Sequence, residues 1–354
     1  MKPLNVAILC VVLAFAAWAS VTVHRSRVEA QVRESSEHPK SGIPPTKSPS
    51  DQSPRETTGL PEERSYPVFF IEEVLAQLTA GADELIEKNL TKNSDALRGN
   101  LDRTRFSTSL ASASTKELSL QELYRNVSES VFLVAGLTKP DEQGGDWQTS
   151  FSTAFVVQED GILSTSAHVF DHDDQDDVVV VLDRKGQVHP VVEILAADLK
   201  ADTCLFRIGI KGLKPLPLGK DASPGTPIRV MGHPGDSFFF FSTGVIANYE
   251  RDDAGLVWLN VTADFGQGSS GGPVMDAAGN VIGQVSRTYT LYAGGPSSRR
   301  RRRPQTVRQV SAIEPENERR EHAPADEPEH PKPDPQMVFK ACTPVSAIRA
   351  LVGN

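Results

Sequence analysis

The chain opens with the basic residue Lys2 and a predominantly apolar stretch over residues 4–23. Near its end, Ala17-Trp18-Ala19 has the small-x-small pattern of a signal-peptidase cleavage site. The stretch is about 20 residues long, which is also the length that a helix needs to span a bilayer. We therefore expect residues 1–24 to be a cleaved signal peptide or a retained membrane anchor, and the pattern leaves both open. Either of them places the rest of the chain outside the cytoplasm.

Two different patterns follow this stretch. Residues 25–66 are rich in Pro, Ser, Thr, Glu and Lys and contain little apolar surface, which is typical of a disordered linker. Apolar residues then recur at steps of three and four between Ile71 and Ile86, interrupted only by Gly81. This spacing predicts an amphipathic helix within a helical segment over residues 67–118. We expect its apolar side to pack on the chain's own domain.

From Val131 onward the pattern changes to short runs with a period of two, separated by turn signals such as Asp160-Gly161. Just before them, Ser119 and Glu122 form a capping-box pattern that predicts a short helix through Tyr124. Many short strands with little helix between them predict an all-β antiparallel barrel or sandwich. The expected strands are 131–136, 151–157, 162–165, 178–182, 188–194, 203–208, 227–232, 238–248, 256–262, 281–288 and 337–341, with a final helix at 345–351.

Residues 296–335 break this pattern with Pro, Arg and Glu, and we expect a disordered insertion inside a domain that extends over residues 119–354. The insertion contains five consecutive arginines, Arg299 to Arg303, followed by acidic residues. A solvated loop is the expected state of such a sequence. Contact of the arginines with anionic lipid headgroups or cell-wall polymers is the alternative.

The composition narrows the functional classes. A net charge of −9 argues against general nucleic-acid binding. A hydrophobic share of 38% together with 25 prolines and 26 glycines excludes a polytopic membrane protein. Three cysteines are too few for a disulfide-stapled mini-domain or a Cys-rich zinc module. We expect no cofactor.

Three short stretches carry candidate chemistry. His168 ends one expected strand, Asp202 begins another, and Ser270 lies in a glycine-rich turn. A serine hydroxyl becomes a nucleophile when a histidine removes its proton, and a carboxylate orients that histidine. We therefore expect Ser270 as nucleophile, His168 as general base and Asp202 as the orienting acid, with Asp198 as the rival to Asp202.

Acyl transfer also needs donors for the oxyanion of the tetrahedral intermediate. The glycines beside Ser270 allow backbone N–H groups to turn toward one point. We expect the N–H groups of Gly268 and Ser270 to form this oxyanion hole.

The three stretches resemble motifs of the trypsin-like serine peptidases, and within them the HtrA/Deg-like bacterial branch. The residues concerned are Ser164 to His168, Asp202 to Phe206 and Gly268 to Pro273. The resemblance covers about 120–292 and 336–354. It implies two six-stranded antiparallel barrels with the triad in the cleft between them, followed by a C-terminal helix. In one respect the chain departs from HtrA proteins, since no segment of the size of a PDZ domain follows the last strand.

The glycine-rich turn also fits the motif of another hydrolase fold. Gly268 to Gly272 also fits the Gly-x-Ser-x-Gly pattern of α/β-hydrolases. In that fold the histidine follows the serine, and here only His322 and His330 follow it, both within the insertion, so we reject this fold. The histidines His172, His189 and His233 are expected in loops or turns.

The resemblance also suggests a specificity pocket. In trypsin-like enzymes an acidic residue six positions before the nucleophile lies at the base of the pocket, and here that residue is Asp264. A pocket for Lys or Arg is one hypothesis, and a surface or structural carboxylate is the alternative, slightly favoured. By the same resemblance the pocket wall consists of Gln284, Val285 and Ser286.

A group of aspartates and a pair of cysteines are candidates for metal binding and for a disulfide. The aspartates between Asp171 and Asp177 lack the spacing and the glycine of an EF-hand, so a solvated acidic loop is expected and no metal. Cys204 and Cys342 lie on expected strands, and both a disulfide and two buried thiols remain open.

The sequence thus predicts an exported serine endopeptidase that acts on polypeptide substrates, with membrane attachment through residues 4–23 as a possibility and no nucleic-acid partner. The first alternative is a catalytically silent protease-fold scaffold or chaperone-like binder. The second is an anchored adaptor whose function lies in the amphipathic helix and the basic insertion.

Overall fold

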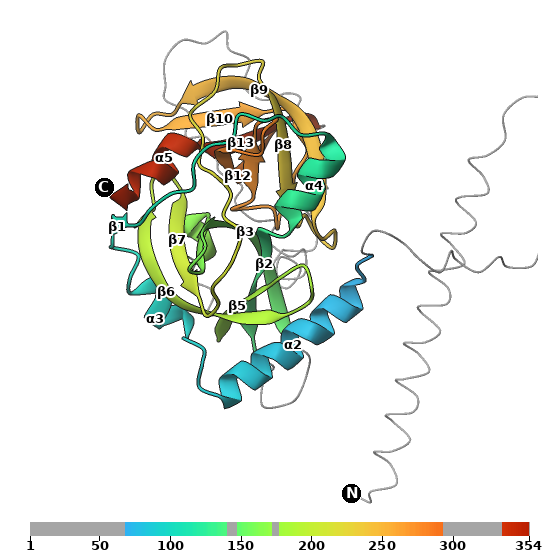
Figure 1. The fold of residues 1–354 in the computed structure, drawn as a ribbon, viewed down its shortest axis with the longest axis vertical. Helices are drawn as coiled ribbons and strands as arrows, with labels where there is room; N and C mark the ends of the chain where they lie inside the picture. Colours follow the sequence, from blue (N-terminus) through green and yellow to red (C-terminus); the bar gives the residue numbers. More distant parts are fainter. Residues whose placement is uncertain (1–67, 140–146, 172–176, 293–334, 354) are drawn as a thin grey trace, which may run out of the picture. The chain divides into compact units, whose positions relative to one another are not determined.

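Two closed six-stranded antiparallel barrels dominate the computed structural model, which describes residues 68–139, 147–171, 177–292 and 335–353 (Figure 1). The first barrel has the strand order β2-β3-β4-β7-β6-β5 and the second the order β10-β13-β12-β11-β8-β9. This all-β fold is the one that the resemblance implied. The strands are β2 (Val131–Thr138), β3 (Gln148–Gln158), β4 (Ile162–Thr165), β5 (Val178–Leu182), β6 (Val188–Asp198), β7 (Thr203–Ile208), β8 (Pro227–Gly232), β9 (Phe240–Arg251), β10 (Val257–Val261), β11 (Pro273–Met275), β12 (Val281–Tyr292) and β13 (Pro335–Pro344).

The strand β5 shows why the barrel strands read as apolar runs. All five of its residues are buried, because each face of the strand meets a different apolar cluster. Val179 and Val181 belong to the cluster of Phe132 and Val134. The alternate residues of β5 belong to the cluster that includes the helix α2 (Ile71–Glu87). A strand covered on both faces has no polar face to show in its sequence.

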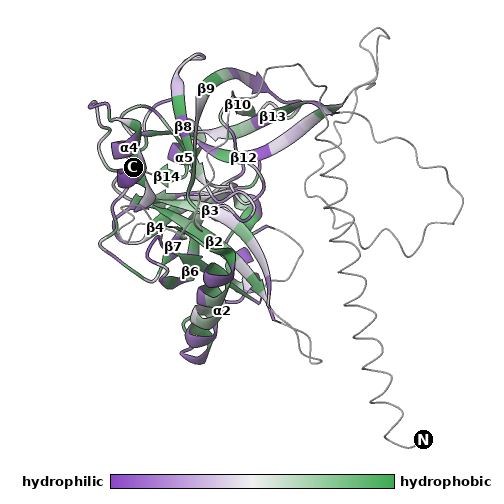
Figure 2. Cartoon of the chain, turned by 90° about the vertical axis from the view of Figure 1, so that its right-hand side faces the viewer, coloured by the Kyte–Doolittle hydropathy of each residue, from purple (hydrophilic) through white to green (hydrophobic). Residues whose placement is uncertain are grey.

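The helix α2 confirms the predicted amphipathic helix and its packing on the chain's own domain. Its residues Val74, Leu78 and Ala82 are buried in the cluster that also contains barrel residues. In Figure 1 the helix runs alongside β5, and Figure 2 shows its alternating apolar and polar colouring. A Cβ at Gly81 would lie 2.5 Å from the Cβ of Val188 on β6, so glycine permits the close approach of helix and barrel.

The rest of the segment predicted as helical, residues 67–118, continues over both barrels. After α3 (Ser94–Arg98), the short strand β1 (Phe106–Ser107) pairs in parallel with β14 (Val352–Gly353) at the other end of the described chain. Further on, the backbone of Ser114 exchanges two hydrogen bonds with the side chain of Asn280, at 2.7 and 2.9 Å. The segment is therefore bound to the strand domain along its length.

The predicted capping box is confirmed at α4 (Leu120–Ser128). The Ser119 side chain accepts the backbone N–H of Glu122, and the Glu122 carboxylate accepts the backbone N–H of Ser119 at 3.0 Å. The helix extends four residues beyond the predicted end at Tyr124. The expected final helix is α5 (Val345–Ala350).

Several predictions fall outside the described residues. The expected signal or anchor, the linker and most of the insertion lie in residues that the structure does not describe. The strands β12 and β13 that flank the insertion pair, with two register shifts, as far as Tyr292 and Pro335. Within the described ranges, no helix has the length and apolar character needed to cross a membrane.

Candidate active site

Strand pairing brings His168 and Asp202 together. His168 lies in a single 3-10 turn, Ala167–Val169, that follows β4, and Asp202 lies in the turn that enters β7. These two strands are antiparallel neighbours, with Thr165 opposite Cys204. The end of one strand therefore lies beside the start of the other, although the two residues are 34 positions apart in sequence, with β5 and β6 between them.

The imidazole of His168 is held by the carboxylate of Asp202. Its Nδ1 lies 3.0 Å from both carboxylate oxygens, and the backbone N–H of His168 donates to Oδ1 at 3.0 Å. The Asp202 side chain is 14% exposed, whereas that of His168 is 49% exposed. Because the carboxylate accepts a hydrogen bond from the Nδ1–H group, the Nε2 atom carries a lone pair that can accept a proton.

The rival residue Asp198 has a different contact. Its Oδ1 accepts the backbone N–H groups of Lys200 and Ala201 at 3.0 and 2.9 Å, so it stabilises the turn that leads to Asp202. This geometry favours Asp202 over Asp198 as the partner of the histidine. Asp202 itself adopts a left-handed backbone conformation with φ of 54°, which aspartate tolerates better than most residues.

Ser286 on β12 lies between Asp202 and Ser270. Its hydroxyl donates to Oδ2 of Asp202 at 2.5 Å, and its carbonyl oxygen accepts the hydroxyl of Ser270 at 3.3 Å. Among the described residues, no hydrogen bond joins Ser270 to His168. Such a bond often forms only when substrate is bound. The sequence had suggested Ser286 for a pocket wall, whereas its side chain contacts the aspartate.

The loop around Ser270 is held by its carbonyl groups. Gln267 and Ser269 accept the backbone N–H groups of Gly235 and Gly272, each at 2.9 Å. Because a peptide unit is planar and its N–H points opposite to its C=O, these bonds fix the direction of the next residues' N–H groups. Those N–H groups belong to Gly268 and Ser270, and neither has an acceptor among the described residues.

Gly268 is required in this loop for steric reasons. Its φ is +93°, and a Cβ there would lie 2.2 Å from the carbonyl oxygen of His233. The loop thus presents two N–H groups without an acceptor, one on each side of Ser269. They are the two N–H groups that the sequence predicts as oxyanion donors, and that role stays a prediction.

Thr153 and His233 lie behind the loop, and sequence reasoning assigned no role to either. The Thr153 hydroxyl donates to the carbonyl of Gly268 at 2.8 Å and lies 3.0 Å from Nδ1 of His233. His233 is fully buried, and this burial lowers the pKa of its imidazole to about 3. It follows β8 in a loop, as expected, whereas His189 lies within β6, contrary to expectation.

The residues suggested for a specificity pocket have other contacts. The Asp264 side chain is 85% exposed and lies 3.7 Å from Nζ of Lys340. Gln284 is buried, where it accepts the hydroxyl of Ser164 at 2.6 Å and contacts the backbone of Asp202. Val285 is buried in the second barrel.

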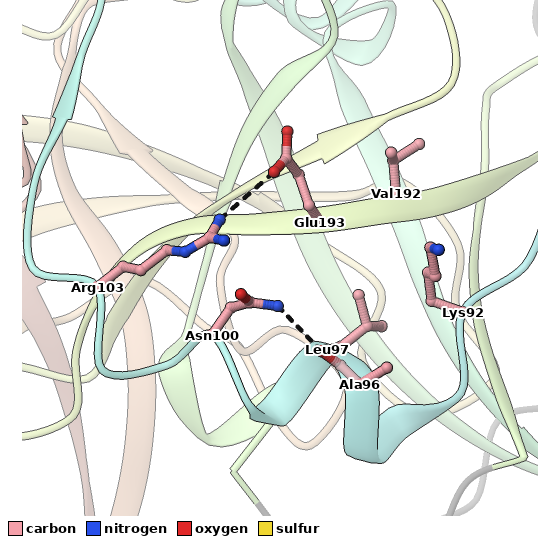
Figure 3. A pocket seen from close by; sticks show the side chains of 7 residues that line it. All are labelled: Lys92, Ala96, Leu97, Asn100, Arg103, Val192 and Glu193. Carbon is pink, nitrogen blue, oxygen red and sulfur yellow. Dashed lines mark hydrogen bonds and ion pairs between the residues drawn. The ribbon is translucent and has the colours of Figure 1, made fainter.

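Other candidate sites are absent or separate in the described part of the chain. No group of His, Cys, Asp or Glu side chains there is arranged to hold a metal ion. Cys204 and Cys342 are free, buried thiols in two different apolar clusters. A hollow of about 430 Å³ lies against α3 and β6 (Figure 3), and it contains none of His168, Asp202 and Ser270.

Comparisons of the sequence with known proteins find the trypsin-like peptidase domain and several serine proteases. Residues 152–283 match the sequence model of the trypsin-like peptidase domain family, a range that contains His168, Asp202 and Ser270. The chain is 27% identical over 161 residues to a probable periplasmic serine endoprotease DegP-like of Halomonas elongata, which is 44% of this chain and 33% of that protein. It is 30% identical over 141 residues to serine protease HTRA1 of Xenopus tropicalis, which is 37% of this chain and 30% of that protein.

Solved structures of HtrA-type proteases are similar as well. The HtrA-type protease AlgW with decapeptide aligns over 49% of this chain and 60% of that chain, at 21% identity and a TM-score of 0.42. The alignments with the curated relatives cover about a third of those proteins' own lengths.

Proposed function

Because this chain carries a trypsin-like peptidase domain related to HtrA and DegP-like proteases, we propose that the protein is an exported serine endopeptidase that hydrolyses peptide bonds through an acyl-enzyme on Ser270. One observation carries the proposal. Ser286 joins the His168–Asp202 pair of the first barrel to the loop that holds Ser270 and the two N–H groups without acceptors, because it hydrogen-bonds to both Asp202 and Ser270.

In the proposed reaction, Oγ of Ser270 attacks the carbonyl carbon of the scissile peptide bond while Nε2 of His168 takes the hydroxyl proton. The carbonyl oxygen becomes negative and is stabilised by the N–H groups of Gly268 and Ser270. His168 then gives its proton to the leaving amine, and the C–N bond breaks. A water molecule, activated by the same imidazole, cleaves the ester and restores the serine.

The roles of Asp202 and Ser286 follow from their contacts. A positive charge develops on His168 during attack, and the carboxylate at 3.0 Å stabilises it and holds the tautomer with a proton on Nδ1. The hydroxyl of Ser286 donates to that carboxylate and so limits its rotation beside the imidazole. Before attack, the Ser270 hydroxyl must turn from the carbonyl of Ser286 toward His168.

Location and substrates are part of the proposal. The name of the Halomonas relative places that protein in the periplasm, and residues 1–24 of this chain have the pattern of an export signal. The similar AlgW structure was solved with a decapeptide, which supports polypeptides as the substrate class. Attachment to a membrane through residues 4–23 stays a prediction from the sequence.

Labelling with an alkyl fluorophosphonate tests the proposed nucleophile. We expect the folded protein to be labelled, mass spectrometry to place the adduct on Ser270 rather than the adjacent Ser269, and fluorescent casein to be degraded. Ser270→Ala removes both signals, and wild-type protein unfolded in urea is the control for non-specific labelling. Labelling of Ser270→Ala as fast as the wild type contradicts the proposal.

A binding scaffold is the second candidate, because Ser270 donates to Ser286 rather than to His168 in the structure. A scaffold would retain unfolded casein without cleaving it and would not react with the fluorophosphonate. Casein that is bound but intact, with no label on Ser270, favours this function over catalysis.

Two interpretations of Asp264 remain. Its exposure and its pairing with Lys340 support a surface carboxylate. The alternative is a pocket that prefers Lys or Arg. A panel of peptides separates them, since cleavage after Val or Leu that equals or exceeds cleavage after Arg contradicts a basic preference.

A further inference from the structure

Thr153, a residue of the first barrel, holds the loop that carries Ser270 in the second. Its backbone N–H donates to the carbonyl of Ser270 at 2.8 Å, and its hydroxyl donates to the carbonyl of Gly268 at 2.8 Å. Its own carbonyl accepts the hydroxyl of Thr165 at 2.7 Å, and this bond connects Thr153 to the neighbouring strand β4. The bonds to Gly268 and from Thr165 are buried, so water does not compete for them.

The bond to Gly268 bears on the direction of the oxyanion donors. It fixes the peptide unit between Gly268 and Ser269, which separates the two N–H groups that lack acceptors. Rotation of that unit would turn the Gly268 carbonyl toward the place of the oxyanion, where its negative end would repel the developing charge. Thr153 is the side chain that opposes this rotation.

His233 decides which way the Thr153 hydroxyl points. A threonine hydroxyl has one hydrogen, and the Thr153 oxygen lies within hydrogen-bond distance of both the Gly268 carbonyl and Nδ1 of His233. When Nδ1 carries the imidazole proton, it donates to Thr153, as the backbone N–H of His233 does at 3.2 Å. The hydroxyl hydrogen is then directed to Gly268, and this tautomer satisfies all three groups.

The surroundings keep the His233 ring neutral and fixed. Its Nε2 is buried without a hydrogen-bond partner in the described residues. The ring meets Phe239 edge-on with centroids 4.7 Å apart. Phe69, which precedes α2, stacks on Phe239 with centroids 5.0 Å apart. The segment before the barrels therefore packs against the aromatic ring that contacts His233.

We propose that Thr153 is a positioning residue for the oxyanion hole, and that neutral His233 directs the Thr153 hydroxyl to the Gly268 carbonyl. This inference rests on the proposed function, because an oxyanion hole has a role only if Ser270 attacks a carbonyl or a similar centre. Neither residue touches the reacting atoms.

The test uses the full chain and an alkyl fluorophosphonate. In that reaction Oγ of Ser270 forms a bond to phosphorus, fluoride leaves, and His168 takes the proton, so the oxyanion hole is used without a need for a known substrate. Saturation kinetics give the rate constant of the bound reagent, kinact, and its binding constant, KI, separately. A loss of alignment lowers kinact, whereas a general distortion of the cleft changes KI as well.

Two pairs of variants separate the hydrogen bonds from the packing. Thr153→Val keeps the shape and the backbone bond but removes the hydroxyl, and we expect kinact to fall about 10- to 100-fold with KI within about 3-fold. Thr153→Ser restores the hydroxyl and is expected within about 3-fold of the wild type. His233→Phe removes the Nδ1 donor and is expected to lower kinact by about 3- to 10-fold, because the backbone donor of residue 233 remains. His233→Asn supplies an amide N–H near the position of Nδ1 and is expected to recover most of this loss.

The outcomes separate the positioning role of Thr153 from the proposed function. A labelled wild type with Thr153→Val equal to it in kinact overturns the positioning role while the proposed function stands. A wild type that is not labelled at all overturns both. If urea unfolding shows that Thr153→Val does not fold, the His233 pair decides: equal kinact for His233→Phe and His233→Asn overturns the inference, and recovery by Asn supports it.

Discussion

The hydroxyl of Ser286 lies 2.5 Å from Oδ2 of Asp202, while the carbonyl of the same residue accepts the hydroxyl of Ser270 at 3.3 Å. One residue of β12 therefore contacts both the candidate acid and the candidate nucleophile. A hydrogen bond to a charged group contributes about 1.5–3 kcal/mol.

We expect removal of the Ser286 hydroxyl to cause a measurable loss of activity. In Ser286→Ala the Asp202 carboxylate loses a donor and turns more freely beside His168, so we expect kcat/KM on fluorescent casein to fall roughly 10-fold or more. Ser223→Ala, which changes an exposed serine in the loop before β8, is the control and is expected to leave the rate unchanged. Equal rates for the two variants would show that Ser286 has no part in orienting the acid.

Because α2 packs closely on the first barrel, we expect one added methyl group at Gly81 to lower the stability of the protein. In Gly81→Ala the new Cβ would lie 2.5 Å from Val188, and the helix must move away from β6. We expect the free energy of unfolding to fall by about 1–3 kcal/mol, although alanine is the better helix former by about 1 kcal/mol.

The control for this prediction is Gly99→Ala. The atoms nearest to a Cβ at Gly99 lie 3.5 Å away, and its φ of −58° suits alanine. Urea unfolding curves of both variants check the prediction, and a Gly81→Ala protein as stable as Gly99→Ala contradicts the tight helix–barrel contact.

The pKa of about 3 for His233 predicts a loss of stability in acid. The folded protein keeps this imidazole neutral, while the unfolded chain takes up a proton below about pH 6.5. Acid therefore favours the unfolded state through this group. The contribution of His233 to the free energy of unfolding falls progressively as the pH drops from about 6.5 toward 3. From about pH 7.5 to about pH 5 the cost is about 2 kcal/mol.

Urea unfolding at the two pH values checks this, with Ser270→Ala as the background so that self-digestion does not interfere. His233→Asn carries no titratable group at the position, so its stability is expected to depend less on pH over the same range. Identical pH dependence with and without the Asn substitution would mean that His233 is protonated in the folded state as readily as in the unfolded one.

The two thiols of the barrels are predicted to be inert. Burial raises the pKa of Cys204 and of Cys342, and the thiolate is the reactive form. We expect a thiol reagent such as DTNB to leave both unmodified in the native protein and to modify both in denaturant without reductant. A missing pair of thiols in denaturant would instead indicate a disulfide, and fast native reaction would indicate exposure.

Sequence patterns predicted the elements whose signals are local. The capping box of Ser119 and Glu122 and the apolar spacing of α2 involve residues three or four apart, and both helices form as expected. The three-residue strand β11 was missed, because it is too short for an alternation to show. The two-residue strand β1 depends on a partner at the opposite end of the chain, which no local pattern reveals.

In the candidate site, too, some residues could be predicted from local motifs and others could not. The types and order of His168, Asp202 and Ser270 could be read from short motifs, and the proximity of His168 to Asp202 follows from the pairing of β4 with β7. The link between Thr153 and Gly268 spans 115 residues, and that between Thr153 and His233 spans 80. Threonine and histidine in these places carry no motif, so only the packed structure reveals their contact.

The pairing of β12 with β13 has a consequence for how this protein can vary. The register holds Tyr292 and Pro335 opposite each other, so the two ends of the intervening stretch are fixed one strand spacing apart whatever connects them. The free energy of closing a loop grows only with the logarithm of its length. Lineages can thus lengthen, shorten or exchange that connection at little energetic penalty to the barrel, which makes it a natural attachment point for new sequence.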